Sequence, residues 1–269
     1  WNRAFMECKG DTGLIKQQEF YDKYVRRTKE RVVVIISDAF RFEVGQTLLK
    51  RLAEDEKCTA SMDAMQSVLP SYTRFGMSAL LPHRKLSMSN DYNVLVDGKV
   101  CDNLNSREQV LQSFVPNSRT VQFDDIKTMK IAELKEIFSG QEVVYVYHNQ
   151  IDARGDKLNT ENEVFTACEE AVEEIHTMIK RLTSANNIRF IITADHGFIY
   201  KRDKLVESDK ISGFERENAF VGRRYVIAPE GIHAEGVGTV RLGNILGNED
   251  DRIVAVPIGS DVFKVAGGG

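Results

Sequence analysis

Three short hydrophobic runs in this chain are each followed by carboxylates, and this pattern constrains the fold more than any other feature. Residues 31–37 run into Asp38, residues 142–148 into Asp152 and Asp156, and residues 189–194 into Asp195 and His196. Continuous Val/Ile-rich runs of this length are typical of parallel strands that are buried on both faces. In open α/β sheets, ligands bind beyond the carboxyl ends of the strands, and carboxylates gathered there repel one another unless a cation lies among them. The pattern therefore predicts a metal site at one edge of a parallel sheet.

The composition agrees with a globular α/β chain. With 269 residues and 42% hydrophobic content, the chain can bury a full core, either as one large domain or as a domain with a cap. The net charge of −4 does not indicate a nucleic-acid or membrane-surface protein, and no apolar run approaches the roughly 20 residues of a membrane span. The four cysteines show no CxxC spacing, which favours reduced thiols and a cytoplasmic location. Because the chain begins at Trp1 without Met, we expect it to be a segment of a longer protein.

Strand and helix patterns alternate along the chain, which predicts a doubly wound, mostly parallel sheet with helices on both faces. Residues 1–30 are charged with a few apolar positions, and we expect a lead-in helix that packs on a domain covering 31–269. The stretch 84–140 mixes short alternating pieces with polar loops and is a candidate inserted cap. The clearest helix is predicted for 161–182, where apolar side chains recur along one face.

Asp38, Asp195 and His196 are the strongest candidate metal ligands. Two carboxylates and an imidazole combine hard oxygens with a borderline nitrogen, and Gly197 allows the backbone to turn away from an ion. The alternative is that each Asp caps a helix and that His196 is an ordinary surface histidine.

Asp152 and Asp156 are candidates for a second ion. They lie four residues apart, so a helical turn would place both carboxylates on one side, where they could share a cation. The alternative is a solvated acidic loop.

Thr73 is the candidate nucleophile, with Ser71 as the second choice, because both hydroxyls lie where a helix is predicted to begin after Pro70. Free N–H groups at a helix start favour an alkoxide and a phosphoryl group, and a metal would be needed to activate the hydroxyl near neutral pH. The alternative is that one of them simply caps the helix.

Arginines and a histidine flank these positions. Arg41 and Arg74 suit phosphate oxygens, although they could instead balance the carboxylates. His148 ends the middle hydrophobic run and is a candidate substrate contact, with a structural role as the equal alternative. We interpret His83, His176 and His233 as structural.

Four motifs, in order, resemble the PglZ domain of bacteriophage-exclusion (BREX) defence systems, within the alkaline phosphatase superfamily. They are Ser37-Asp-Ala-Phe-Arg41, Leu69-Pro-Ser-Tyr-Thr-Arg-Phe-Gly76, His148-Asn-Gln-Ile-Asp-Ala-Arg-Gly-Asp156 and Thr193-Ala-Asp-His-Gly-Phe-Ile-Tyr200. The resemblance runs from about residue 31 to 265 and implies a domain with two divalent metals, often zinc, and a transiently modified Ser or Thr. Carried over by position, it implies one metal on Asp38, Asp195 and His196, with Thr73 bridging, and another on Asp152 and Asp156.

Two departures from the superfamily pattern matter. Where many relatives have a histidine, this chain has Asp156, which favours oxygen ligation and weakens the case for zinc at that site. None of the five histidines matches the late His-Gly-Gly motif of the superfamily, so we expect it beyond this segment.

These observations predict a metal-dependent phosphatase or phosphodiesterase of a phage-defence system, with zinc favoured over manganese or magnesium. The expected partners are a phosphoester, including a nucleotide or nucleic acid, and other BREX proteins, with no membrane. The main alternative is a catalytically weak metal-binding scaffold that acts through other defence proteins. A phosphomutase or sulfatase relative is a third reading.

Overall fold

The computed structural model describes residues 2–8, 11–28, 30–155, 163–201, 206–214, 218–229, 231 and 234–264. The helices are α1 (Asn2–Glu7), α2 (Phe42–Ala53), α3 (Thr73–Ala79), α4 (Leu104–Phe114), α5 (Phe123–Ile126), α6 (Ile131–Phe138), α7 (Gln150–Gly155), α8 (Val164–Ser184) and α9 (Leu242–Leu246). The strands are β1 (Ile15–Lys16), β2 (Val32–Ser37), β3 (Met65–Gln66), β4 (Leu86–Met88), β5 (Val94–Val96), β6 (Lys99–Val100), β7 (Ser118–Gln122), β8 (Val143–His148), β9 (Phe190–Thr193), β10 (Lys210–Ile211), β11 (Phe220–Val221), β12 (Val226–Ala228), β13 (Val237–Arg241), β14 (Ile253–Pro257) and β15 (Val262–Phe263).

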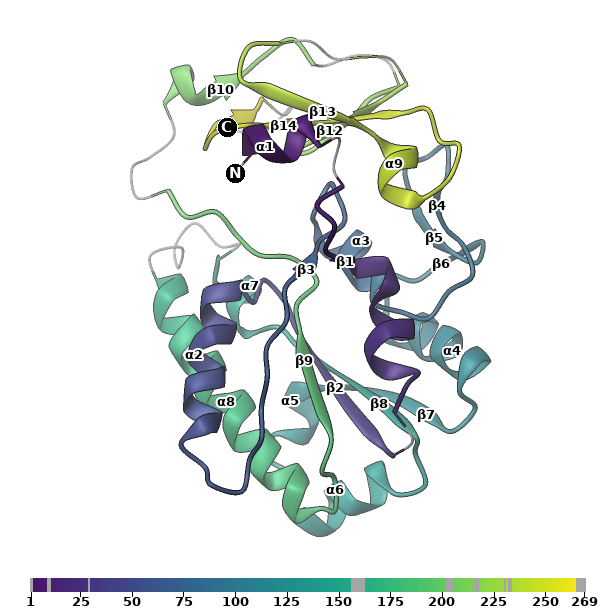
Figure 1. Cartoon of the computed structure of the whole chain (residues 1–269), viewed down its shortest axis with the longest axis vertical. Coiled ribbons are helices and arrows are strands. Elements are labelled where there is room, and N and C mark those ends of the chain that lie inside the picture. Colours follow the sequence, from purple (N-terminus) through teal and green to yellow (C-terminus); the bar gives the residue numbers. More distant parts are fainter. Residues whose placement is uncertain are drawn as a thin grey trace.

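A four-stranded parallel sheet in the order β7-β8-β2-β9 forms the centre of the larger part of the molecule, which lies below the C-terminal strands in Figure 1. The three hydrophobic runs form β2, β8 and β9, as their sequence predicts. In the register of the sheet, Ser37 at the end of β2 lies beside His148 at the end of β8, and Ile36 lies beside Thr193 at the end of β9. The carboxyl ends of these strands therefore reach the same edge, where the acidic residues follow.

Helices cover both faces of this sheet, because β2 has no polar face to expose. Val32, Val34 and Ile36 pack into one core cluster with α3, α4 and the N-terminal segment. Val33 and Ile35 pack into a second cluster, which includes residues of α2, α6 and α8. This arrangement confirms the predicted α/β fold with a parallel sheet and flanking helices. The buried stripe of α8 also follows its sequence pattern, from Val164 to Leu182.

The N-terminal segment differs from the single lead-in helix that its sequence predicts. It contains α1, the short strand β1, a 3-10 turn η1 (Gln17–Glu19) and a π-helical turn η2 (Tyr21–Val25). Phe20, Tyr21 and Val25 are nevertheless buried in the main core, so this segment packs as an integral part of it.

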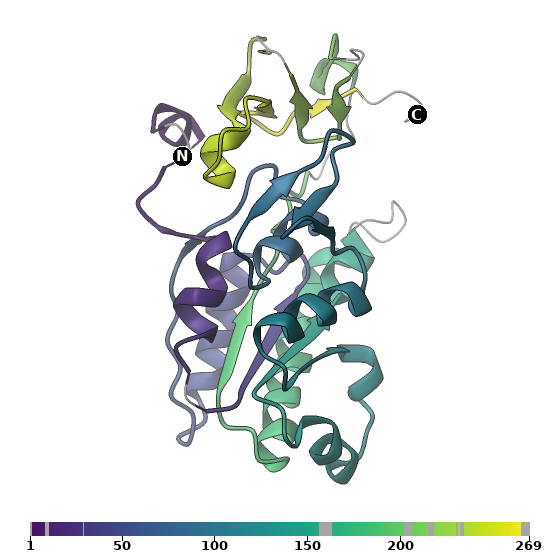
Figure 2. The same ribbon diagram turned by 90° about the vertical axis from the view of Figure 1, so that its right-hand side faces the viewer.

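The segment 84–140, a candidate cap in the sequence, runs through the central domain instead. Its strand β7 pairs with β8 in the main sheet, and α4 packs on β7. Only β4, β5 and β6 form a separate small antiparallel sheet. The layer that lies across the carboxyl edge is built later in the chain, by the antiparallel sheet β11-β12-β14-β13, together with α9 (Figure 2).

Within the described part of the chain, no helix combines the length and the apolar character needed to cross a membrane. All four cysteines lie among the described residues, and each is a free thiol.

Candidate metal centre

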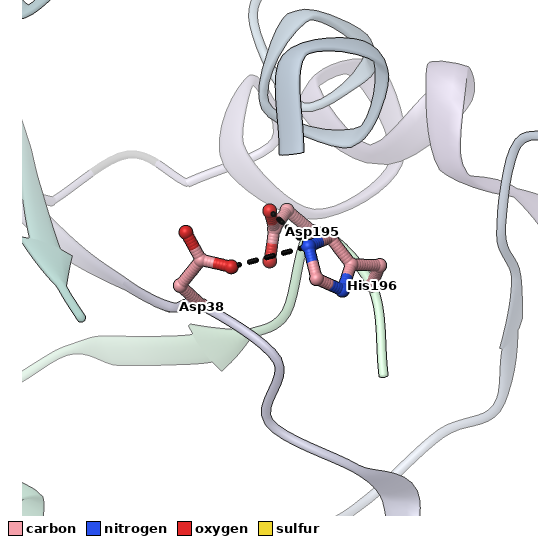
Figure 3. Close-up of side chains that lie close together, drawn as sticks. All are labelled: Asp38, Asp195 and His196. Atoms are coloured by element: carbon pink, nitrogen blue, oxygen red, sulfur yellow. Dashed lines mark ion pairs between the residues drawn. The ribbon is translucent and has the colours of Figure 1, made fainter. Parts of the chain in front are cut away.

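Asp38, Asp195 and His196 meet at the carboxyl edge of the sheet (Figure 3). Asp38 directly follows β2, and Asp195 and His196 follow the neighbouring strand β9. One ligand atom from each lies within 4.8 Å of the other two. His196 Nε2 is 3.3 Å from Asp38 Oδ1 and 3.5 Å from Asp195 Oδ2. The strand order thus brings together residues that are far apart in the sequence, as the three acidic strand ends predict.

The carboxylates of Asp38 and Asp195 are buried, and one oxygen of each has no hydrogen-bond partner among the described residues. Asp38 is 4% exposed and Asp195 is fully buried. Asp38 Oδ1 and Asp195 Oδ2 have no hydrogen-bond partner among the described residues, and they are the oxygens that face His196. An unpaired buried carboxylate is costly, because burial penalises the charged form. Three oxygen and nitrogen atoms at this spacing therefore fit a divalent ion.

The electrostatics of the site lead to the same conclusion. Burial, followed by the nearby charges of Asp195 and Asp152, raises the pKa of Asp38 to about 9. Burial also raises the pKa of Asp195, although His196 and the Ala39 amide act in the opposite direction. Without a cation, these raised pKa values favour bound protons on the two carboxyl groups. A bound ion would replace them, as in other sites where a metal dominates the local charge.

The imidazole of His196 is oriented by its own backbone. Nδ1 donates a hydrogen bond to the Gly197 carbonyl oxygen at 2.8 Å. This bond fixes the proton on Nδ1 and leaves the lone pair of Nε2 directed at the carboxylates, the usual arrangement of a ligating histidine. Nε2 also accepts a hydrogen bond from the Thr73 hydroxyl at 3.0 Å. The candidate nucleophile and the candidate ligands therefore meet at one nitrogen atom.

Thr73 is the first residue of α3, which begins where the sequence predicts a helix after Pro70. α3 packs very closely on the turn that carries the ligands. A Cβ atom added at Gly76 would lie 2.2 Å from the Asp195 carbonyl oxygen, so only glycine permits this approach. The sequence contains Gly76 within a helical pattern, but nothing local shows what it approaches.

The second group of predicted ligands is only partly described. Asp152 lies in the first turn of α7, which follows β8, and its charge helps to raise the pKa of Asp38. Asp156 lies outside the described residues, so its prediction stays untested.

His148 is buried, and both of its ring nitrogens have protein partners. Nδ1 pairs with the Ser37 hydroxyl at 2.9 Å and Nε2 with Glu174 at 3.0 Å, and the ring packs edge-on against Phe123. The side chain is 2% exposed. This geometry favours the structural alternative for His148 over a substrate contact.

A cleft of about 3030 Å³ lies at this edge of the central sheet. Its opposite side is formed partly by the antiparallel sheet β11-β12-β14-β13, called the C-terminal sheet below. Thr73, Ser71, Asp152 and Arg41 line the cleft together with Asp195 and His196. The Arg41 guanidinium pairs with Glu43 and lies 5.0 Å above the Phe198 ring. Arg74 is exposed on α3, next to Thr73. The structure thus places Arg41, rather than Arg74, on the wall of the cleft.

A parallel α/β sheet with an Asp/Asp/His group and a hydroxyl at its carboxyl edge defines a class of alkaline-phosphatase-like domains. The family comparison is specific: residues 18–269 match the model of the BREX system PglZ alkaline phosphatase-like domain, and the chain belongs to this family.

Two relatives carry the same description. The chain is 38% identical over 263 residues to the alkaline phosphatase-like protein PglZ of Bacillus cereus (strain H3081.97), covering 96% of this chain and 31% of that protein. It is 31% identical over 266 residues to the alkaline phosphatase-like protein BrxZ of Escherichia coli O9:H4 (strain HS), covering 95% of this chain and 30% of that protein. The chain therefore spans less than a third of the length of these relatives.

Proposed function

We propose that this chain is the metal-dependent phosphoryl-transfer domain of a BREX phage-defence protein, acting as a phosphatase or phosphodiesterase with Thr73 as its nucleophile. One observation carries the proposal. Two buried carboxylate oxygens without hydrogen-bond partners and the Thr73 hydroxyl all face the same nitrogen, Nε2 of His196. Family membership supports the reaction class, because the relatives are described as alkaline phosphatase-like proteins.

The residues present fit the metal that such a reaction needs. Asp38, Asp195 and His196 would hold one divalent ion, and Asp152 with Asp156 would hold a second. The mixed oxygen and nitrogen set favours zinc at the first position, with manganese or magnesium as alternatives. A bound ion would lower the pKa of the Thr73 hydroxyl and stabilise charge on the phosphoryl oxygens.

The other steps belong to the chain itself. Thr73 Oγ1 attacks phosphorus and forms a bond to it, the ester bond to the leaving group breaks, and the proton lost by the Thr73 hydroxyl is balanced by the proton that the leaving oxygen takes up to become an alcohol. Water then hydrolyses the phosphothreonine and regenerates the hydroxyl. Arg41 on the cleft wall supplies positive charge for phosphate oxygens. The cleft volume of about 3030 Å³ leaves the substrate open between a monoester and a diester, including a nucleotide or a nucleic-acid strand.

Elemental analysis followed by hydrolysis assays tests this proposal. We expect one tightly held divalent ion per chain, since the second position has two carboxylates here and catalytic zinc sites normally take three protein ligands. Hydrolysis of p-nitrophenyl phosphate and bis(p-nitrophenyl) phosphate should depend on added zinc, manganese or magnesium. A protein that binds no divalent ion and hydrolyses neither ester would contradict the proposal.

Thr73→Ala, with Ser71→Ala as the matched control, tests the nucleophile. Both hydroxyls line the cleft, but Thr73 is the one bonded to His196. In the complete protein, Thr73→Ala should lower kcat by several orders of magnitude, while metal content and Tm stay close to normal. Activity that survives in Thr73→Ala and is lost in Ser71→Ala would move the role to Ser71. Survival in both variants would rule out covalent catalysis by either hydroxyl.

The second candidate function is a metal-binding scaffold. Such a scaffold would keep the fold and the metal but act through other defence proteins. Asp195→Ala separates the two functions. For an enzyme, this change should remove metal and activity together. For a scaffold, it should remove metal from a protein that had no hydrolytic activity, and binding of the other BREX proteins should weaken with it.

A further inference from the structure

Gln17 is a buried polar side chain that forms its hydrogen bonds with backbone groups close to the candidate metal centre. It belongs to η1, and it is 1% exposed. Its Nε2 donates to the Asp195 carbonyl oxygen at 2.7 Å and to the Ala194 carbonyl oxygen at 3.1 Å. Its Oε1 accepts from the Val68 amide at 3.1 Å. The amide can take only this orientation, because carbonyl oxygens accept and a backbone N–H donates.

These three contacts join two segments that have no hydrogen bonds within the central sheet. The ladder between β2 and β9 ends at Thr193, so Ala194, Asp195 and His196 lie beyond its hydrogen bonds. Val68 lies on the segment that leads into α3 and Thr73. Gln17 therefore spans the turn with two candidate ligands and the segment that delivers the candidate nucleophile.

The Asp195 carbonyl oxygen is held from two sides. Gln17 donates to it, and α3 approaches it so closely at Gly76 that no Cβ would fit. A backbone group fixed in this way sets the direction of the Asp195 and His196 side chains. Partners that orient ligands in this manner change metal affinity or activity by about 10- to 100-fold when they are removed.

We propose that Gln17 is a positioning residue, which holds the Asp195–His196 turn at the distance from Thr73 that metal binding and phosphoryl transfer require. It touches neither substrate nor metal and acts through the backbone of Asp195. The catalytic part of this inference rests on the proposed function, whereas the structural part does not. Gln17 lies just outside the residues that match the family model, which begin at 18.

Gln18 provides a matched control in the same turn. Its Nε2 also donates to a backbone carbonyl, that of Ile245 at 2.6 Å, but this carbonyl belongs to α9 and lies away from the metal centre. Gln17→Met and Gln18→Met each keep the length of the side chain and remove its hydrogen bonds. Gln17→Glu keeps an acceptor for the Val68 amide and removes the donors to the two carbonyls, so it serves if Gln17→Met does not fold.

Three measurements in the complete protein test the proposal. In folded Gln17→Met or Gln17→Glu, metal affinity and kcat should each fall by about 10- to 100-fold while KM changes little. Amide exchange should rise in peptides that cover residues 66–73 and 193–197. Gln18→Met should leave all three quantities at the values of the unaltered protein.

The outcomes separate this inference from the proposed function. If the unaltered protein shows no hydrolysis, the proposed function fails, and exchange in the two segments still decides the role of Gln17. Unchanged exchange in these segments and unchanged metal affinity in a folded Gln17 variant would overturn the inference. So would a Gln18→Met variant with equal losses, because the effect would then be general destabilisation of the turn.

Discussion

At the scale of single residues, the candidate metal centre combines deep burial with groups that carry negative charge when ionised. Asp38 and Asp195 are enclosed, and their inner oxygens have no hydrogen-bond donor among the described residues. The pKa of Asp38 is raised to about 9, first by burial and then by the charges of Asp195 and Asp152. Ionisation of these two buried carboxyl groups therefore destabilises the folded protein unless a cation or bound protons neutralise their charge.

This combination predicts an unusual dependence of stability on pH for the metal-free protein. Because the folded-state pKa of Asp38 lies above its ordinary value, the folded protein binds more protons than the unfolded chain between about pH 4 and pH 9. The stability due to the protonated carboxyl is present below this window and is lost as the pH rises through it. In EDTA, the Tm of the unaltered protein should therefore fall toward pH 9, whereas Asp38→Asn should show a weaker fall and a higher Tm at pH 8.

Asp250→Asn is the control, because its carboxylate has the opposite shift. Hydrogen bonds from Arg252 lower the pKa of Asp250. Loss of this carboxylate should lower the Tm at neutral pH and matter less as the pH falls toward its pKa. Parallel pH curves for the unaltered protein and Asp38→Asn would show that Asp38 ionises without cost, and the argument for a cation from burial would fail.

At the scale of helices and strands, the sequence predicts features that neighbouring residues determine better than features that depend on contacts between distant residues. The runs that form β2, β8 and β9 are continuous and apolar, and the carboxylates that follow them are visible in the sequence. The sequence of β7 is less distinctive, because this strand lies at one edge of the sheet and its burial is uneven, with Arg119 exposed. The roles of Gln17 and Gly76 could not be predicted, since each depends on a contact with Asp195, which is distant in the sequence.

The close approach of α3 to the ligand turn predicts the effect of Gly76→Ala. The added methyl group would overlap backbone atoms of Asp195, which cannot move as a flexible side chain could. We expect a loss of about 1–3 kcal/mol in the free energy of unfolding, together with weaker metal binding, because α3 must shift and carries Thr73 with it. Chemical denaturation and metal titration measure the two effects.

Gly45→Ala is the matched control for this change. Gly45 lies inside α2, and the nearest atom to an added Cβ would be the flexible end of Met62, at 3.0 Å. This variant should be as stable as the unaltered protein or more stable by up to about 1 kcal/mol, since alanine favours the helix. If both alanine variants behave alike, the contact between Gly76 and Asp195 does not control the site.

At the scale of the whole molecule, stacked aromatic rings connect the nucleophile helix to the C-terminal sheet. The Tyr72 and Tyr225 rings stack with their centroids 5.1 Å apart, Tyr225 contacts Phe220 at 5.8 Å, and Phe220 stacks on Tyr92 at 5.5 Å. Tyr72 directly precedes Thr73, while Tyr225 and Phe220 belong to the layer that lies across the carboxyl edge. The layer therefore packs on Tyr72, the residue that directly precedes α3.

A double-mutant cycle on Tyr72→Leu and Tyr225→Leu measures this connection. We expect a coupling energy of about 0.5–1.5 kcal/mol, which is typical of a stacked aromatic pair. Because both residues line the cleft, either change should also raise KM for an ester substrate. Phe214→Leu, which loosens the Phe214–Phe263 ring pair in the core cluster that packs on β12 and β14, should lower stability without changing KM. A coupling energy near zero would mean that the two layers are held together elsewhere.

The position of β9 in the sheet gives a bound ion a second consequence. β9 is the last strand in the order β7-β8-β2-β9, so it is hydrogen-bonded within this sheet to β2 alone. Asp38 extends from β2 and Asp195 from β9, and an ion shared between them would fasten an outer strand to an inner one. An ion that binds only when β2 and β9 are paired stabilises this pairing by mass action. Removal of a bound ion should therefore loosen the sheet first between β2 and β9, and β9, which leads into two of the three candidate ligands, would become its weakest edge.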